Sequence, residues 1–149
     1  MIKAFIASLA LSTLCIPQVN AEVFTDYDLL KYHEALGGRV YVDSAACDDP
    51  RVMGMKQGVS IHICAENAKG DLDEISDTIR HEVWHMVQAC NGGPITDDQV
   101  SMMGEAYAKG WTGQGYDADV WHIEAEAHFA AATFTPQEIK NALDKFCFD

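Results

Sequence analysis

The sequence predicts an α+β domain that is mainly helical, disulfide-stapled, and built with a short β-sheet ahead of one central helix. Three observations predict this class. Most of the second half has helical periodicity with capping signals, only two short stretches resemble strands, and the cysteines suit disulfide pairing. Residues 22–149 are expected to form a single domain, because this length supports one hydrophobic core and is short for two.

The N-terminus has the pattern of a secretory signal peptide. Lys3 supplies the positive charge, residues 4–16 form an apolar run too short to cross a bilayer, and Val19-Asn20-Ala21 forms a small-residue cleavage site. Cleavage is therefore expected after Ala21. The sequence predicts a signal peptide at 1–21 and a mature protein that is secreted or periplasmic.

The cysteine count supports export. With Cys15 removed in the signal peptide, four cysteines remain: Cys47, Cys64, Cys90 and Cys147. An even number in an exported chain predicts two disulfides, and three pairings are possible. We expect Cys47 to pair with Cys64 and Cys90 with Cys147. A four-cysteine metal site is the alternative, although the chain has no C-x-x-C motif.

The composition is strongly acidic, with 23 acidic and 10 basic residues and a formal net charge of −13. This charge argues against nucleic acid or an anionic membrane surface as a partner. No stretch beyond the signal peptide is long and apolar enough for a membrane span. The expected partner is a peptide or protein substrate, and the oligomeric state stays open.

Seven elements are expected in order. They are a helix at 26–36, strands at 39–43 and 59–64, a central helix from about 71 to 91, and helices opening near Thr96, Asp119 and Thr135. The segment 44–58 is polar and is expected to be a loop. The strand at 59–64 is expected to offer a free edge to an extended substrate. The glycine-rich segment 110–117 is a candidate rim of the cleft.

The central helix contains the pattern H-E-x-x-H at His81, Glu82 and His85. Residues four apart lie about 40° from one another around a helix, so both imidazoles can reach one metal ion. Glu82 is offset from that line and can reach a water on the metal, as a general base does. The apolar residues of this helix follow another face, while one polar face carries Thr78, His81, His85 and Gln88. The alternative is a pair of helix histidines that bind no metal.

A catalytic zinc usually has three protein ligands and one open position, and the downstream candidates are Glu105, Glu124 and Glu126. An H-E-x-x-H helix followed by a glutamate on a later helix resembles the zincin metallopeptidases, in their gluzincin branch. The resemblance implies a zincin-like fold, a Zn²⁺ cofactor, and hydrolysis of peptide bonds with Glu82 as the base. The longer histidine motif of the metzincins is absent after His85.

Two local patterns compete for the third ligand. Glu105 and Ala106 have the spacing of thermolysin-type enzymes, whereas Glu124-Ala125-Glu126-Ala127 resembles the glutamate helix of other small gluzincins. The second pattern has His128 where those enzymes carry an aspartate. We favour Glu124, with Glu126 and Glu105 as alternatives. His128, one turn after Glu124, is expected to orient that carboxylate or to act on the substrate.

The sequence thus predicts an exported zinc metallopeptidase. Tyr116 and His128 are candidate catalytic residues, and His122 and Tyr107 are further candidates for the donor that stabilises the oxyanion. Two alternatives stay open. One is a catalytically silent zincin-like binding or inhibitory module, and the other is an amidase that acts on cell-wall peptide. Nothing in the sequence identifies the substrate.

Overall fold

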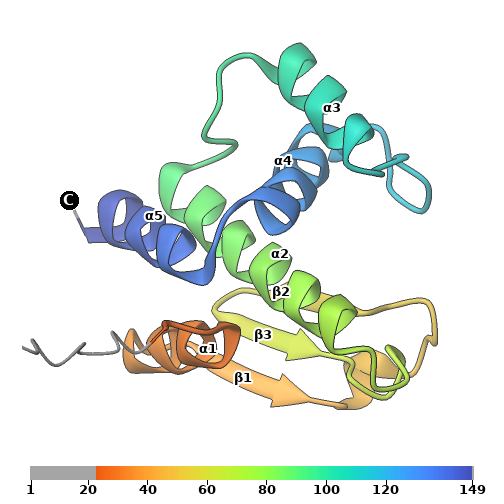
Figure 1. Ribbon diagram of the computed structural model, residues 1–149, viewed down its shortest axis with the longest axis vertical. Coiled ribbons are helices and arrows are strands. Elements are labelled where there is room, and N and C mark those ends of the chain that lie inside the picture. Colours follow the sequence, from red (N-terminus) through yellow and green to blue (C-terminus); the bar gives the residue numbers. More distant parts are fainter. Residues whose placement is uncertain (1–22, 149) are drawn as a thin grey trace, which may run out of the picture.

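The computed structural model describes residues 23–148, and the predicted signal peptide lies outside this range (Figure 1). The described chain is α+β, with five helices and a three-stranded sheet. The elements are α1 (Asp26–Ala35), β1 (Arg39–Val42), a 3₁₀ turn (Ala45–Cys47), β2 (Gly54–Gln57), β3 (Ser60–Ile63), α2 (Leu72–Asn91), α3 (Gln99–Ala108), α4 (Trp121–Thr133) and α5 (Pro136–Phe148). No helix among these residues is long and apolar enough to cross a membrane.

Helix α2 is the centre of the fold. It packs against the sheet on one side and against α4 on the other, with α1 and α5 also in contact (Figure 1). Val83 and Val87 on its apolar face are fully buried. Asp71 caps its N-terminus by accepting hydrogen bonds from two backbone N–H groups. Gly92, in the left-handed conformation at φ 79°, ends it, as the sequence predicts.

The sheet has the strand order β1-β3-β2, with β3 parallel to β1 and antiparallel to β2. Ile61 and Ile63 of β3 are buried in the main core. The prediction of a loop over 44–58 is wrong in part, because this segment contains β2. Gly54–Gln57 has no alternating pattern, and pairing with β3 is what makes it a strand. Since β3 is paired on both sides, the edge strands of the sheet are β1 and β2, and the predicted strand at 59–64 has no free edge.

Both expected disulfides are present. Cys47–Cys64 ties the 3₁₀ turn to the residue after β3, and Cys90–Cys147 joins the end of α2 to α5. The second bond closes a sequence separation of 57 residues. One disulfide therefore pins the loop beside the sheet, and the other holds the last helix to the central one.

The structure changes one predicted helix start. Helix α3 begins at Gln99, and its N-cap is Asp98, whose carboxylate accepts from Ser101 N. The predicted cap, Thr96, lies outside the helix, where its N–H donates to the buried carboxylate of Glu126. Thr135, in contrast, forms the predicted capping box with Glu138 at the start of α5.

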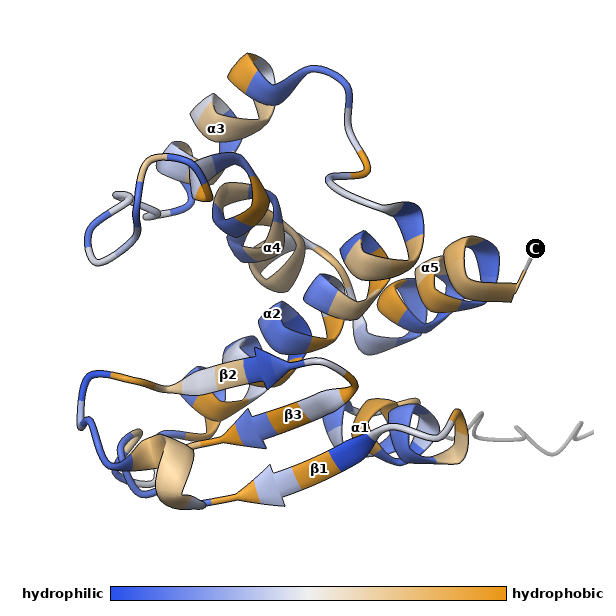
Figure 2. Cartoon of the chain, turned by 180° about the vertical axis from the view of Figure 1, so that it is seen from behind, coloured by the Kyte–Doolittle hydropathy of each residue, from blue (hydrophilic) through white to orange (hydrophobic). Residues whose placement is uncertain are grey.

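Hydropathy follows this arrangement. In Figure 2, hydrophobic residues recur along α4 and α5, and they alternate with polar residues along β1 and β3. The main core contains residues of α1, β3, α2, α4 and α5, whereas a smaller cluster joins Ala106 of α3 and Trp111 to Ala125 of α4. Helix α4 therefore contributes to both clusters and connects the main core with α3.

Candidate metal centre

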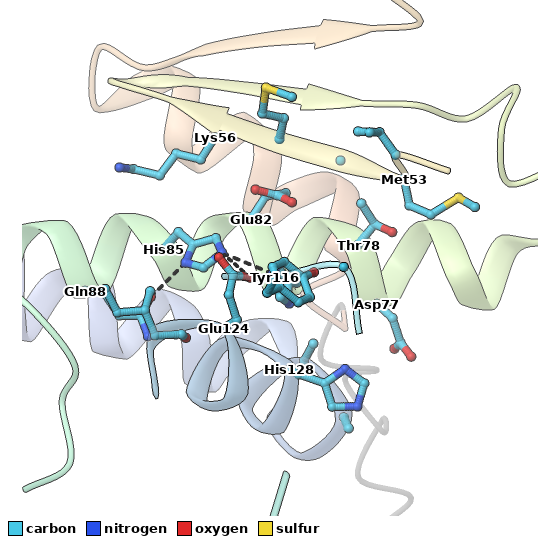
Figure 3. Close-up of a pocket in the computed structure, with 18 of the residues that line it drawn as sticks. Met53, Lys56, Asp77, Thr78, Glu82, His85, Gln88, Tyr116, Glu124 and His128 are labelled. Atoms are coloured by element: carbon cyan, nitrogen blue, oxygen red, sulfur yellow. Dashed lines mark hydrogen bonds and ion pairs between the residues drawn. The ribbon is translucent and has the colours of Figure 1, made fainter. Parts of the chain in front are cut away.

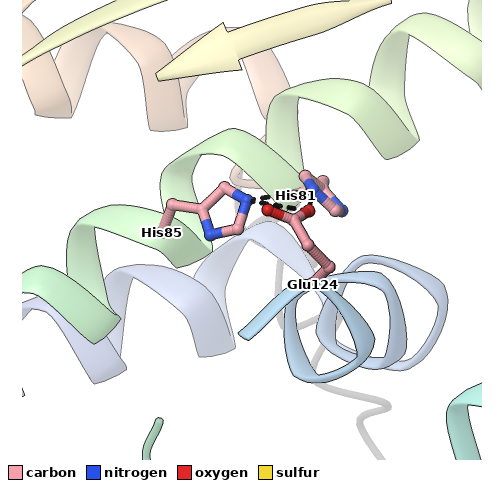
Figure 4. A group of neighbouring side chains, drawn as sticks. All are labelled: His81, His85 and Glu124. Carbon is pink, nitrogen blue, oxygen red and sulfur yellow. Dashed lines mark hydrogen bonds and ion pairs between the residues drawn. The ribbon is translucent and has the colours of Figure 1, made fainter. Parts of the chain in front are cut away.

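Three side chains from two helices converge beside α2. His81 and His85 project from α2, and Glu124 projects toward them from the first turns of α4 (Figure 4). Glu124 Oε2 lies 3.2 Å from His81 Nε2 and 3.5 Å from His85 Nε2. The two Nε2 atoms are 3.1 Å apart. Three potential ligand atoms thus form a triangle of nearly equal sides, a group that could hold a metal ion.

These separations can be compared with those that zinc requires. Ligand atoms about 2.0–2.1 Å from a tetrahedral Zn²⁺ are about 3.3 Å from one another. The sides of the triangle scatter around that value. Two imidazole nitrogens and one carboxylate oxygen are also a donor set that zinc accepts, with one tetrahedral position left for water or substrate. The residues therefore fit the metal in number, type and spacing.

The group borders a cleft of about 1200 Å³ between the sheet and the α4 side of the molecule (Figure 3). One wall is the chain from Met53 to Lys56, which includes most of β2, and the opposite wall includes Tyr116 and His128. Glu82 of α2 lies on the β2 side of the cleft, where its side chain is buried. The cleft thus has α2 as its floor and the free edge of β2 along one side.

The two carboxylates of the cleft have opposite electrostatic environments. Burial raises the pKa of Glu82 to about 7, and the nearby Glu124 carboxylate adds to the rise, against the opposing effects of His85 and Lys56. Burial also raises the pKa of Glu124, but the His81 and His85 rings that face the carboxylate outweigh burial and lower the pKa to about 2. Glu124 is therefore ionised near neutral pH, whereas Glu82 can take up and release a proton there.

The two histidines also differ. Burial lowers the pKa of His81, although the hydrogen bond to Glu124 opposes this. Burial acts in the same direction on His85, but there the nearby Glu124 and Glu82 carboxylates outweigh it and raise the pKa. The lowered pKa favours the neutral form of the His81 ring, whereas the raised pKa means that a metal ion competes with a proton more strongly at His85 than at His81.

Residues 23–148 match the model of a protein family described as "Domain of unknown function (DUF8637)". The chain belongs to this family. No curated protein and no solved structure matches the chain. In this DUF8637 domain the match spans every helix and strand described above, including both elements that carry the candidate metal centre.

The DUF8637 fold separates the three glutamates that the sequence left as alternatives. Glu124 joins the two histidines. Glu126, two residues on and so about 200° around α4, is buried on another face and accepts hydrogen bonds from Gln88, Trp84 and the backbone of Ile95. Glu105 is exposed on α3. Neither of these two alternatives is in the group.

The structure places some of the other predicted site residues at the cleft and others away from it. Tyr116 and His128 line the cleft of the DUF8637 domain, whereas Tyr107 and His122 do not. The spacing of Glu124 and His128 predicted that His128 would orient the carboxylate, but the His128 ring bonds elsewhere. Its Nε2 donates to the backbone oxygen of Lys109 at 3.2 Å, because α4 turns this side chain toward the end of α3.

Tyr116 is held at the cleft through its backbone. Its carbonyl oxygen accepts a hydrogen bond of 3.1 Å from Trp121 Nε1, at the start of α4. Burial, together with the Glu124 and Glu82 carboxylates, raises the pKa of the Tyr116 phenol to about 12. The hydroxyl therefore stays protonated near neutral pH and is able to donate a hydrogen bond.

The residues of the cleft that were not predicted as site residues include Gln88, Gly54 and Lys56. Gln88 had a sequence signal, since it shares the polar face of α2 with the two histidines. Gly54 and Lys56 had none, because they belong to the strand that only the pairing with β3 creates.

Proposed function

We propose that this DUF8637 domain is a zinc-dependent metallopeptidase that hydrolyses peptide bonds. One observation carries the proposal: the 3.1–3.5 Å triangle of His81 Nε2, His85 Nε2 and Glu124 Oε2 borders the same cleft as Glu82. This geometry agrees with the resemblance of the H-E-x-x-H helix and a later glutamate to the gluzincins.

His81, His85 and Glu124 would hold the zinc ion. When bound, zinc supplies a Lewis acid that acidifies water and polarises a carbonyl group. The protein supplies the proton transfer. Glu82, with a pKa of about 7 in the metal-free protein, is suited to accept a proton from the attacking water and to deliver it to the leaving amine. Its burial keeps its carboxylate out of bulk water, where proton exchange with solvent would compete.

Tyr116 is the side chain best suited to stabilise negative charge on the substrate oxygen. It lines the cleft opposite β2, keeps its proton near neutral pH, and is anchored by Trp121. A neutral donor aimed at developing charge stabilises the transition state more than the ground state. His128 also lines the cleft, but its Nε2 is already engaged by Lys109.

The free edge of β2 supports a peptide as the substrate. Strand β2 pairs with β3 on one side, and Gly54, Met55 and Lys56 border the cleft. An extended peptide that hydrogen-bonds to such an edge adds a strand to the sheet and lies along the floor formed by α2. Gly54, without a side chain, leaves the backbone close to Glu82.

The two disulfides fit an oxidising compartment, and the proposed protein acts after export, as a secreted or periplasmic enzyme. The strongly acidic composition, with a formal net charge of −13 for the full sequence, keeps it soluble there.

The test combines metal content with turnover. Oxidised protein spanning 22–149 is dialysed against trace Zn²⁺ and analysed for bound metal. It is then incubated separately with a mixed peptide library and with cell-wall peptide, and both are read by mass spectrometry. Four proteins are compared: wild type, Glu82→Gln, Glu124→Ala, and Glu105→Ala as a matched control on the exposed face of α3. We expect wild type and Glu105→Ala each to bind one zinc ion and to cleave peptides.

The variants separate the roles. Glu82→Gln keeps zinc and loses about 10²–10⁴-fold in turnover, as expected for a general base. Glu124→Ala loses zinc. A wild type that binds no zinc overturns the proposal. A wild type that binds zinc but leaves the library and cell-wall peptide intact indicates the silent binding module instead, and cleavage of cell-wall peptide alone indicates the amidase.

A further inference from the structure

Glu126 and Gln88 form a buried polar pair behind the metal centre. Their side chains are 2 % and 3 % exposed, and both lie on helices that contribute apolar residues to the main core. Gln88 Nε2 donates to Glu126 Oε2 at 2.8 Å and to the backbone oxygen of Ile123 at 2.9 Å. Such a pair is costly to bury unless it is fully hydrogen-bonded, so its bonding pattern fixes its orientation.

The orientation of the Gln88 amide follows from these two bonds. A carboxylate oxygen and a backbone carbonyl oxygen can only accept, so the group that faces them must be the NH₂ of the amide. The amide oxygen is then directed at His85, where Gln88 Oε1 lies 2.8 Å from Nδ1 (Figure 3). An amide oxygen has no proton to give, so Nδ1 of His85 carries the hydrogen of this bond.

A proton on Nδ1 determines what the other nitrogen of His85 can do. In the neutral ring, Nε2 then has the lone pair, and Nε2 is the atom that faces His81 and Glu124. The neighbouring His81 Nε2 lies 3.1 Å from it and 3.2 Å from Glu124, so a proton on His81 Nε2 satisfies both acceptors in the metal-free state. The whole group is thus consistent with one tautomer of His85.

Glu126 is in turn held in place by the chain that follows α2. Its carboxylate accepts from Ile95 N at 2.9 Å, from Thr96 N at 2.8 Å and from Trp84 Nε1 at 3.3 Å. These donors come from the connection between α2 and α3 and from α2 itself. The two backbone donors, whose bonds are shorter than the one from Trp84, hold the carboxylate in the position from which it accepts the Gln88 amide.

We propose that Gln88 is a positioning residue for His85, and that Glu126 orients Gln88. Together they fix the Nδ1–H tautomer of His85 and aim its Nε2 lone pair at the metal position. This inference rests on the proposed zinc site for its purpose. The tautomer itself is a property of the metal-free protein, and so it can be tested separately.

The first measurement is the tautomer. Two-bond ¹H–¹⁵N correlation spectra of ¹⁵N-labelled, metal-free wild type at pH 9 identify which nitrogen of His85 carries the proton. The expected result is Nδ1–H. A dominant Nε2–H form overturns the inference, because the Gln88 oxygen would then face a lone pair. This experiment needs neither zinc nor a variant, so it decides the matter even where a substitution prevents folding.

The second measurement is zinc affinity by competition with a chelator, in wild type, Gln88→Leu and Trp84→Phe. Gln88→Leu removes the acceptor for His85, and its zinc Kd is expected to rise about 10–100-fold. Trp84→Phe is the matched control: it removes one donor to Glu126 and loosens the same buried region, but leaves the Gln88–His85 bond in place. Its zinc Kd is expected to stay within about threefold of wild type.

The outcomes distinguish this inference from the proposed function. An unchanged zinc Kd in Gln88→Leu, or an equal loss in Trp84→Phe, overturns the positioning role while the zinc site stands. A wild type that binds no zinc overturns the proposed function. The tautomer of His85 in the metal-free protein then still decides whether Gln88 fixes the proton on Nδ1.

Discussion

Gly54 lies directly against Glu82: a Cβ added to Gly54 would come within 2.9 Å of Glu82 Oε1 and within 2.5 Å of Thr78 Cγ2. We therefore expect Gly54→Ala to push β2 away from α2 or to displace Glu82. Such overpacking costs about 1–3 kcal/mol in the free energy of unfolding. A shift of Glu82, the proposed general base, by about 1 Å costs about 10²-fold in turnover. Chemical denaturation and peptide cleavage measure the two effects.

Two further variants control this prediction. Gly104→Ala, on α3 with nothing within 4 Å of the added Cβ, is expected to stabilise the helix by about 0.5–1 kcal/mol and to leave turnover unchanged. In Gly54→Ala/Thr78→Ser the atom that causes the shortest contact is gone, so part of the lost stability should return. Wild-type turnover in Gly54→Ala would contradict the placement of β2 against Glu82.

Tyr116→Phe tests the proposed oxyanion donor. Removal of a hydroxyl that stabilises the transition state is expected to lower kcat about 10²–10³-fold. Zinc affinity should be unchanged, because Tyr116 is not in the candidate metal-binding group. Tyr107→Phe is the matched control, since that side chain is 70 % exposed on α3. Steady-state kinetics on one cleaved peptide measure both variants. Equal kcat values for Tyr116→Phe and wild type would rule out this role.

The disulfide between Cys90 and Cys147 should contribute strongly to stability. It closes a sequence separation of 57 residues, and the loss of unfolded-chain entropy for a loop of that size is worth about 4 kcal/mol. We expect Cys90→Ala/Cys147→Ala to lower the free energy of unfolding by about that amount in urea titrations. The proposed metal ligands lie on other turns, so the zinc content of the folded variant should persist. A loss below about 1 kcal/mol would contradict this account.

His33 should make stability depend on pH. Its ring is buried, with Nε2 3.0 Å from the backbone oxygen of Val59, and burial lowers its pKa below 6.5 despite that hydrogen bond. Because the pKa of His33 is lower in the folded state, the folded protein binds fewer protons at this ring than the unfolded chain does. The contribution of His33 to stability is therefore complete above pH 6.5, the ordinary pKa, and is lost as the pH falls through the folded pKa. The wild type should therefore lose stability between pH 8 and pH 5 through this group.

The comparison uses His33→Gln, which keeps a donor for Val59 but does not titrate. We expect the difference in unfolding free energy between pH 8 and pH 5, measured in urea, to be smaller in the variant than in wild type. Gly38 packs against the His33 ring, and a Cβ added to Gly38 would overlap the ring atoms. Both proteins therefore retain Gly38, so that only the side chain at position 33 differs between them. An equal pH dependence in the two proteins would show that His33 is not responsible.

Local signals predicted most of the helices. Asp71 and Gly92 mark the two ends of α2 because a capping carboxylate and a left-handed glycine act within one turn of the residues they cap. The same reasoning gave the wrong start for α3. Thr96 has the sequence of a cap, but its N–H is taken by Glu126 from α4, and Asp98 caps the helix instead. A contact between distant elements overrode a local preference.

The sequence alone determined that His81 and His85 share one face of a helix, that Glu82 is offset from them, and which cysteines were available for pairing. Each of these follows from the helical repeat or from a simple count. The tertiary structure decided that Glu124 joins the histidines, that Glu126 anchors Gln88, and that Gly54–Gln57 is a strand beside the cleft. These depend on how α4 and β3 pack against α2 and β2. Periodicity assigns residues to faces, but only the packing of one element on another determines which faces meet.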